Sequence, residues 1–252
     1  MQLAIEADWL FAVYLISLRL GVVLMFAPMF VGLQGFVTVR VLLTLACALV
    51  LADGAPRPVL TFGLGAIVAS SAAELVVGGV MAFGVLAAFA VFSVAGKILE
   101  IQSGFGIGGV YDPVTNAPSP VFGTLLNLTA VAVFFAMQGH HALLRGMAYS
   151  FERIAPGSGF AQLPGEAMIA QFGVVFSLGV AFLIPVVACL LLIEFGLAIV
   201  SRMLPQMNVI IVLVPIKIAA ALILFALTVP FAQGSMARVF RSLFEYWERI
   251  LG

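Results

Sequence analysis

Long apolar runs dominate this chain, and short polar stretches separate them. The runs cover residues 9–31, 36–52, 59–96, 122–139, 167–200 and 209–231. A transmembrane helix needs about 20 consecutive apolar residues, and most of these runs reach or approach that length. The pattern therefore predicts an all-α, polytopic membrane protein.

Two of the runs are too long for a simple span. As one helix, residues 59–96 would measure about 57 Å, roughly twice the hydrocarbon core of a bilayer. This run is either two spans joined as a hairpin or one long helix partly buried in protein. Residues 167–200 also exceed one span, and Pro185 predicts a kink there. The fold class is thus one of long kinked helices and helical hairpins.

The last part of the chain, residues 235–251, has a different pattern. Its apolar residues recur at spacings of three and four, and its charged residues occupy the opposite face of a helix. The apolar face either lies on the membrane surface or docks on a partner protein.

The longest stretch without an apolar run is the loop within residues 97–123. Its first half is rich in glycine, and its second half is rich in proline. The residues that define it are Gly104, Gly106, Gly108, Gly109, Asp112, Pro113, Pro118 and Pro120. Such a loop between membrane-length helices either faces water or lines a cavity inside a protein assembly.

Composition supports the membrane class. Of the 252 residues, 64% are hydrophobic and 9% are charged, against about 25% charged in soluble domains. Eleven basic and eleven acidic residues cancel, so no nucleic-acid partner is expected. Cys47 and Cys189 lie in apolar runs and are interpreted as buried small hydrophobes. Glu6, Asp8 and Arg19 argue against a cleavable signal peptide.

Motifs for catalysis or cofactor binding are weak. The glycines from Gly104 to Gly109 have the spacing G-x-G-x-G-G with no preceding strand, which argues against a nucleotide loop. His140 and His141 are adjacent, so on a helix they cannot share one metal ion as an i, i+4 pair does. No aspartate lies within an apolar run. We expect no enzyme, cofactor or metal site.

Six charged residues lie in or beside apolar runs, where charge is costly. They are Arg19, Glu74, Lys97, Glu100, Glu194 and Lys217. We expect them to pair between helices or subunits; the alternative is an ion path, as in an ion-coupled secondary transporter. Glu194 and Lys217 flank one short turn and can meet across a hairpin, and Lys97 and Glu100 are spaced i, i+3.

Several blocks of residues recur at characteristic places along the chain. The blocks are Arg19, Pro28, Phe30 and Arg40; Gly104, Gly106, Asp112-Pro113, Pro120 and Gly123; Leu126-Asn127, Gly139-His140, Leu143-Leu144, Ser150-Phe151 and Pro156-Gly157; and Pro205-Gln206-Met207-Asn208 with Pro215 and Lys217. Together these blocks resemble the FliR family of flagellar export-gate proteins and, more distantly, its counterpart in virulence type III secretion. The resemblance covers nearly the whole chain.

The resemblance implies a function and an assembly. The expected function is export of unfolded flagellar axial proteins through a pore in the basal body, in the bacterial inner membrane. The virulence type III system and the transporter remain alternatives. Expected partners are about five FliP-like subunits and several FliQ-like subunits, which build a short helical cone with this chain. Other export-apparatus membrane proteins are further expected partners. Exported unfolded proteins are the transient cargo.

The resemblance also assigns parts of the chain. Residues 1–165 correspond to a FliP-like part, residues 166–232 to a FliQ-like helical hairpin, and residues 233–252 to the amphipathic C-terminal helix. The loop at about residues 100–121 is expected to plug the pore. The plug residues are Gly104, Phe105, Gly106, Ile107, Gly108, Gly109, Val110, Tyr111, Asp112, Pro113 and Pro120.

Overall fold

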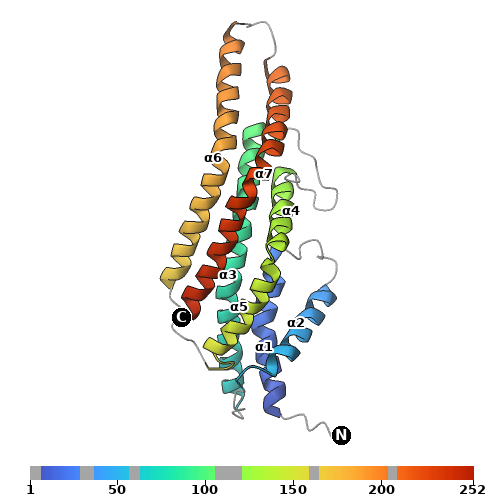
Figure 1. Ribbon diagram of the computed structural model, residues 1–252, viewed down its shortest axis with the longest axis vertical. Helices are drawn as coiled ribbons and strands as arrows, with labels where there is room; N and C mark the ends of the chain where they lie inside the picture. Colours follow the sequence, from blue (N-terminus) through green and yellow to red (C-terminus); the bar gives the residue numbers. More distant parts are fainter. Residues whose placement is uncertain (1–6, 29–36, 57–62, 106–120, 159–164, 204–208) are drawn as a thin grey trace. The chain divides into compact units, whose positions relative to one another are not determined.

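The chain is all-helical in the part that the structure describes. The computed structural model describes residues 7–28, 37–56, 63–105, 121–158, 165–203 and 209–252, with side chains left out for 209–213. That part contains seven α-helices and no β-strand (Figure 1). The helices are α1 (Ala7–Phe26), α2 (Val37–Ala52), α3 (Leu64–Ser103), α4 (Val121–Ala136), α5 (Gly139–Arg153), α6 (Gly165–Met203) and α7 (Val209–Leu251).

Four helices in the described part are long and apolar enough to cross a membrane. They are α1, α3, α6 and the part of α7 from Val214 to Leu251, and α4 with α5 forms a fifth candidate as one broken span. The break lies at Gln138, whose φ of 57° is left-handed, so the α4 helix cannot continue through it. The chain is therefore a polytopic membrane protein.

The described part of the apolar run at residues 59–96 folds as one long helix rather than a hairpin. Helix α3 has 40 residues and measures about 60 Å. Helices α6 and α7 have 39 and 43 residues and carry Pro185, Pro215 and Pro230 inside them. Proline removes one backbone donor but does not end a long helix whose apolar neighbours keep it packed. The glycines of α3, among them the adjacent Gly78 and Gly79, likewise leave the helix unbroken.

The amphipathic C-terminal stretch is the end of α7, not a separate helix. Its apolar face is buried within the chain itself: Leu243, Tyr246 and Trp247 are at most 2% exposed. The Tyr246 hydroxyl donates to the carbonyl of Val80 at 3.1 Å, and Trp247 Nε1 donates to that of Met81 at 3.0 Å. The sequence predicted that this face contacts the membrane surface or a partner protein. In the structure the face packs on α3 instead.

The described chain forms two compact units, and both are discontinuous in sequence. Unit 1 comprises Met1–Ala88, Gln138–Gly173 and Arg241–Gly252; unit 2 comprises Phe89–Met137 and Val174–Phe240. Helices α3, α6 and α7 each contribute to both units. The boundaries expected from the resemblance, at residues 165 and 232, stay a prediction.

In unit 1, two glycines let other elements approach α3 closely. A Cβ on Gly78 would lie 2.9 Å from the carbonyl oxygen of Arg19. A Cβ on Gly84 would lie 2.7 Å from the ring of Tyr246. Small residues at such crossings bring helix backbones together, so α1 and the end of α7 pack directly on the α3 backbone.

In unit 2, aromatic rings fill the core. The Phe240 ring of α7 lies 5.2 Å from Phe89, 5.8 Å from Phe92 and 5.1 Å from Phe134, between ring centroids. All four side chains are at most 1% exposed. Tilted and edge-to-face pairs at this spacing stabilise beyond their buried area. They join α3, α4 and α7 into one packed layer of rings.

The tightest helix crossing in unit 2 gives a stability prediction. A Cβ on Gly96 of α3 would lie 2.2 Å from the Cα of Gly123 in α4. Replacing Gly96 with alanine must push α4 away, and overpacking of this kind costs about 1–3 kcal/mol. We expect the G96A variant to unfold at a lower temperature in mild detergent.

Gly79 of the same helix supplies the matched control, because nothing lies within 4 Å of a Cβ placed there. Alanine is the better helix former by about 1 kcal/mol, so G79A is expected to unfold at the same temperature or higher. Equal melting of G96A and the unchanged chain would contradict the close crossing.

Candidate functional site

The sequence places the main functional segment in the loop between α3 and α4. The structure describes only the first two expected plug residues, Gly104 and Phe105. The others lie outside the described residues: Gly106, Ile107, Gly108, Gly109, Val110, Tyr111, Asp112, Pro113 and Pro120. What the structure defines is the place from which the loop leaves and to which it returns, which we call the loop base.

The loop base joins the end of α3 to the start of α4. Glu100 Oε1 accepts a hydrogen bond of 2.7 Å from the backbone N–H of Val121, the first residue of α4. The first N–H groups of a helix have no partner within it, and a carboxylate there also favours the helix dipole. Glu100 is 9% exposed, so the bond forms away from bulk solvent. It caps α4 from a residue 21 positions earlier in the chain.

The first loop residues are held on the same base. Gly104 has a φ of 78°, a left-handed conformation that glycine adopts without strain. The Ser103 hydroxyl accepts the backbone N–H of Phe105 at 3.3 Å. The Phe105 ring then meets Phe122 of α4 edge-to-face at 5.9 Å, and Phe122 meets Phe225 of α7 at 5.7 Å. Both ends of the loop are thus fixed at one point of unit 2.

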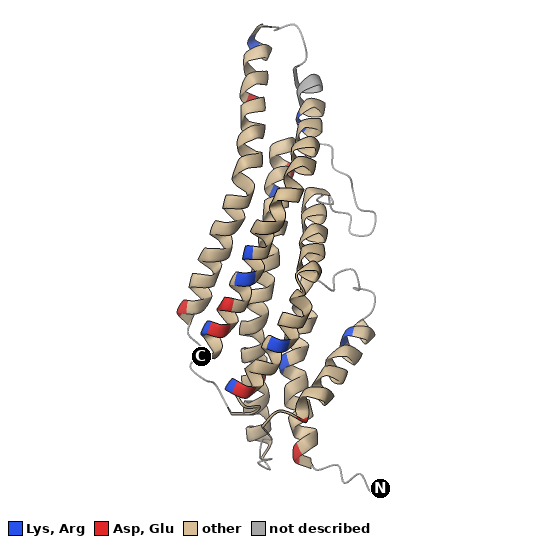
Figure 2. Ribbon diagram, viewed as in Figure 1, with Lys and Arg blue, Asp and Glu red and all other residues tan. Residues whose placement is uncertain are grey.

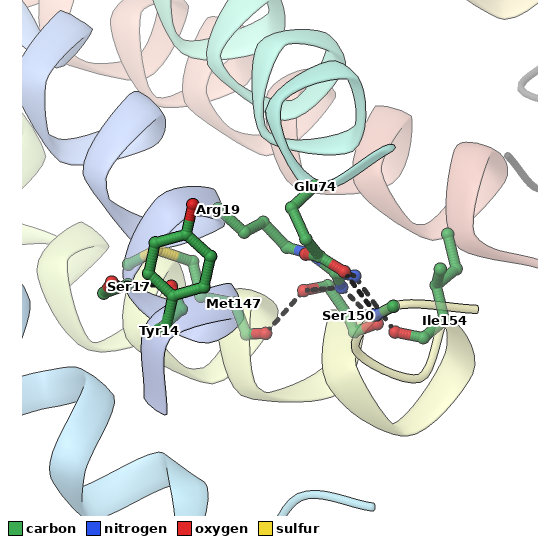
Figure 3. Close-up of polar contacts among 8 residues, drawn as sticks. Tyr14, Ser17, Arg19, Glu74, Met147, Ser150 and Ile154 are labelled. Carbon is green, nitrogen blue, oxygen red and sulfur yellow. Dashed lines mark hydrogen bonds and ion pairs between the residues drawn. The ribbon is translucent and has the colours of Figure 1, made fainter. Parts of the chain in front are cut away.

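A second polar site lies in unit 1, where Arg19 of α1 meets Glu74 of α3 (Figure 3). Arg19 Nε donates to Glu74 Oε2 at 2.7 Å, and Nη2 donates to Oε1 at 3.1 Å. The pair is bidentate, the strongest geometry for a guanidinium and a carboxylate. Arg19 is 1% exposed and Glu74 is 2% exposed, so each charge depends on the other.

The remaining donors of Arg19 are also satisfied within the protein. Nη1 donates to the carbonyl of Ser150 at 3.0 Å, and Nη2 donates to that of Ile154 at 3.1 Å. The guanidinium carbon lies 4.5 Å from the centroid of the Phe151 ring, a cation–π contact. Glu74 Oε1 in turn accepts the backbone N–H of Gly157 at 2.9 Å. One ion pair therefore joins α1, α3 and α5 with the segment after α5.

A third polar site lies in unit 2 and is more open. Lys217 Nζ of α7 lies 3.2 Å from Glu194 Oε2 of α6. The same oxygen accepts Gln102 Nε2 of α3 at 3.0 Å. The Glu194 side chain is 52% exposed, so solvent or a neighbour weakens this pair relative to the buried one.

Of the six charged residues that were expected to pair, four do so. Two pairs form, Arg19 with Glu74 and Glu194 with Lys217, whereas Glu100 bonds Val121 and Lys97 is exposed. Charged residues are sparse along the helices (Figure 2). In the residues that the structure describes, no group of three His, Cys, Asp or Glu side chains is placed to hold a metal ion.

Sequence reasoning missed the partners of these charges. Ser150, Ile154 and Gly157 bind Arg19 or Glu74 mainly through backbone groups, which carry no residue-specific signal. The blocks Ser150-Phe151 and Pro156-Gly157 belong to the resemblance, and that was the one available hint. The bonds of the Arg19–Glu74 pair occupy both groups, so neither is free to bind a transported ion.

The buried pair gives a second prediction. Breaking a buried ion pair by removing one partner costs about 3–5 kcal/mol, because the other charge stays buried. We expect E74A and R19M each to lower the unfolding temperature in mild detergent strongly. The double variant R19M/E74A is expected to lose less than the sum of the two, since neither charge is then left alone.

The control is E166A, which removes an exposed carboxylate of the first turn of α6. It is expected to change the unfolding free energy by no more than about 0.5 kcal/mol. Strictly additive losses for R19M and E74A would show that the two side chains do not stabilise each other.

Comparison with known proteins places this architecture in a family. The family described as bacterial export proteins, family 1, matches residues 10–243. Flagellar biosynthetic protein FliR of Bacillus subtilis is 32% identical over 177 residues, which cover 69% of this chain and 67% of that protein. FliR of Aquifex aeolicus is 29% identical over 62% of this chain and 60% of that protein.

A virulence relative matches at lower identity. Yop proteins translocation protein T of Yersinia pestis is 26% identical over 61% of this chain and 60% of that protein. The family match spans most of the helices described above, including both ion pairs and the loop base. The chain therefore belongs to the bacterial export proteins of family 1, and it is a FliR-family protein.

Proposed function

We propose that this chain is a subunit of the flagellar type III protein export gate, in which it helps to form the pore and plugs it. The family match over residues 10–243 and the FliR relatives support the export role. The flagellar reading is favoured over the virulence reading because the B. subtilis FliR relative is 32% identical and the Y. pestis relative 26%. The proposed location is the basal body in the bacterial inner membrane.

The loop base is the observation that carries the plug proposal. A closed export pore must stop ions, which requires a narrow or dewetted constriction. It must also open for an unfolded chain. A loop that leaves and returns at one fixed point can move as a unit without disturbing α3 and α4. Glu100 and the Phe105–Phe122 contact supply that fixed point.

The loop composition supports the same role. Glycines allow the backbone to repack at low cost, and prolines limit the range of its conformations. The sequence predicts an apolar seal of Phe105, Ile107, Val110 and Tyr111. Because Phe105 packs on Phe122 at the loop base, in this proposal Ile107, Val110 and Tyr111 form the part of the seal that moves. In this proposal the energy for export is supplied by other members of the assembly.

Partner subunits are the next element of the proposal. Large apolar side chains are exposed along α6 and α7, among them Leu192 at 71%, Phe195 at 67% and Phe231 at 83%. We propose that FliP-like and FliQ-like subunits cover part of this surface, with residues 1–165 acting as the FliP-like part. Residues 166–232 act as the FliQ-like hairpin, which the Glu194–Lys217 pair holds in unit 2.

Purification in mild detergent tests the function. We expect a particle with one copy of this chain, about five FliP-like subunits and several FliQ-like subunits, held together by heterologous contacts. Mass photometry and subunit identification by mass spectrometry measure the composition. A stable monomer that transports a solute in liposomes would overturn the proposal, and virulence-type partners would redirect it to the other pathway.

Shortening the loop tests the plug. Deletion of residues 106–119 is expected to make resting cells leak small ions and solutes, because the apolar seal is removed while the helices remain. Uptake of a small impermeant dye and the membrane potential measure the leak. Normal permeability with a fully assembled complex would rule out the plug role.

Two point variants sharpen this test. E100A removes the acceptor that holds Val121, so we expect a smaller leak than with the deletion. The matched control is K97A, one turn away on α3 with an exposed side chain, which should leave permeability unchanged. Equal leakage from both variants would show that the loop base does not position the plug.

A further inference from the structure

A pocket in unit 1 has no role in the export function described above. It has a volume of about 570 Å³ and opens between α5 and the C-terminal part of α7. That volume lies in the range of ordinary ligand sites. We propose that this pocket binds the headgroup of an anionic phospholipid, with phosphatidylglycerol as the preferred class.

The rim of the pocket is basic. Arg145, Tyr149 and Arg153 all line it, and their spacing of four residues places them on one face of α5. Arg153 Nε donates to the Tyr149 hydroxyl at 2.6 Å, and its guanidinium lies 5.1 Å from the centroid of that ring. These contacts hold one guanidinium in place. Guanidinium groups bind phosphate oxygens in a bidentate manner.

The floor of the pocket is apolar. Phe244 and Trp247 of α7 line it and meet edge-to-face at 6.0 Å. Trp247 is 2% exposed, and its Nε1 already donates to the carbonyl of Met81. The accessible ring surface of the floor therefore comes mainly from Phe244, which is partly exposed. A ligand that suits both rim and floor carries an anionic group and an apolar part.

Glu248 of α7 also lines the pocket. Among the lining side chains the two arginines outnumber the one glutamate, and Gly252 also lines the pocket. The carboxylate accepts hydrogen bonds and donates none. A glycerol headgroup supplies hydroxyl donors for Glu248 while its phosphate meets the arginines. This combination favours phosphatidylglycerol over a bare phosphate.

The polar face of α5 carries both arginines of the pocket. Helix α5 buries Leu143, Met147 and Phe151 within the protein and exposes Arg145 and Arg153. In membrane proteins, arginines beside aromatic rings commonly contact lipid headgroups. A lipid is therefore the source of the phosphate that we propose.

The test uses the purified full chain in mild detergent, titrated with phosphatidylglycerol, with bound lipid counted by native mass spectrometry. The variant R145Q/R153Q is expected to bind this lipid about 25-fold more weakly, about fivefold for each arginine. The control R202Q removes an exposed arginine of α6 that does not line the pocket, and its affinity should be unchanged.

Competition separates the lipid from other sources. Phosphatidylethanolamine and phosphatidylcholine are expected to bind more weakly than phosphatidylglycerol, and millimolar inorganic phosphate should not displace it. Unchanged lipid affinity in R145Q/R153Q overturns the proposal. So does equal binding of phosphatidylethanolamine, or displacement by inorganic phosphate. If the double variant fails to fold, R145Q alone supplies the test, because Arg145 makes no hydrogen bond in the described structure.

Discussion

In so apolar a chain, every buried polar group must find its partner inside the protein. Lipid offers none, and an unpaired buried charge costs several kcal/mol. The Arg19–Glu74 pair meets this constraint in unit 1 by using the carbonyls of Ser150 and Ile154 and the N–H of Gly157. Glu100 meets it in unit 2 by capping α4. These bonds hold the start of α4 and the segment that follows α5.

Hydropathy alone predicts much of the fold. The apolar runs correspond to the observed helices, and the class of polytopic all-α membrane protein is confirmed by the described helices. Hydropathy could not decide between a hairpin and one helix for α3, because both bury the same residues. A hairpin needs a turn, and the run contains the adjacent glycines Gly78 and Gly79 but no proline. In the structure Gly78 serves the close approach of α1 to α3 instead of a turn.

The candidate site was harder to predict, for a physical reason. A charged residue inside an apolar run is costly to bury, so Arg19, Glu74 and Glu194 can be recognised in the sequence. Their partners do not, because Ser150 lies 131 positions from Arg19 and acts partly through its carbonyl. The C-terminal stretch shows the same limit: its amphipathic pattern is visible, but periodicity cannot say whether lipid, a partner or α3 covers the apolar face. Trp247 shows that α3 does.

Three helices are longer than a membrane span requires. Helices α3, α6 and α7 measure about 60 Å or more, whereas the hydrocarbon core is about 30 Å thick. Apolar side chains stay exposed along most of α6, from Ile169 at 76% to Met203 at 75%. The bilayer covers only part of that length. The remaining apolar surface must therefore pack against other protein to be shielded from water. A chain built in this way is most stable as one member of an assembly, which is the state that an export gate requires.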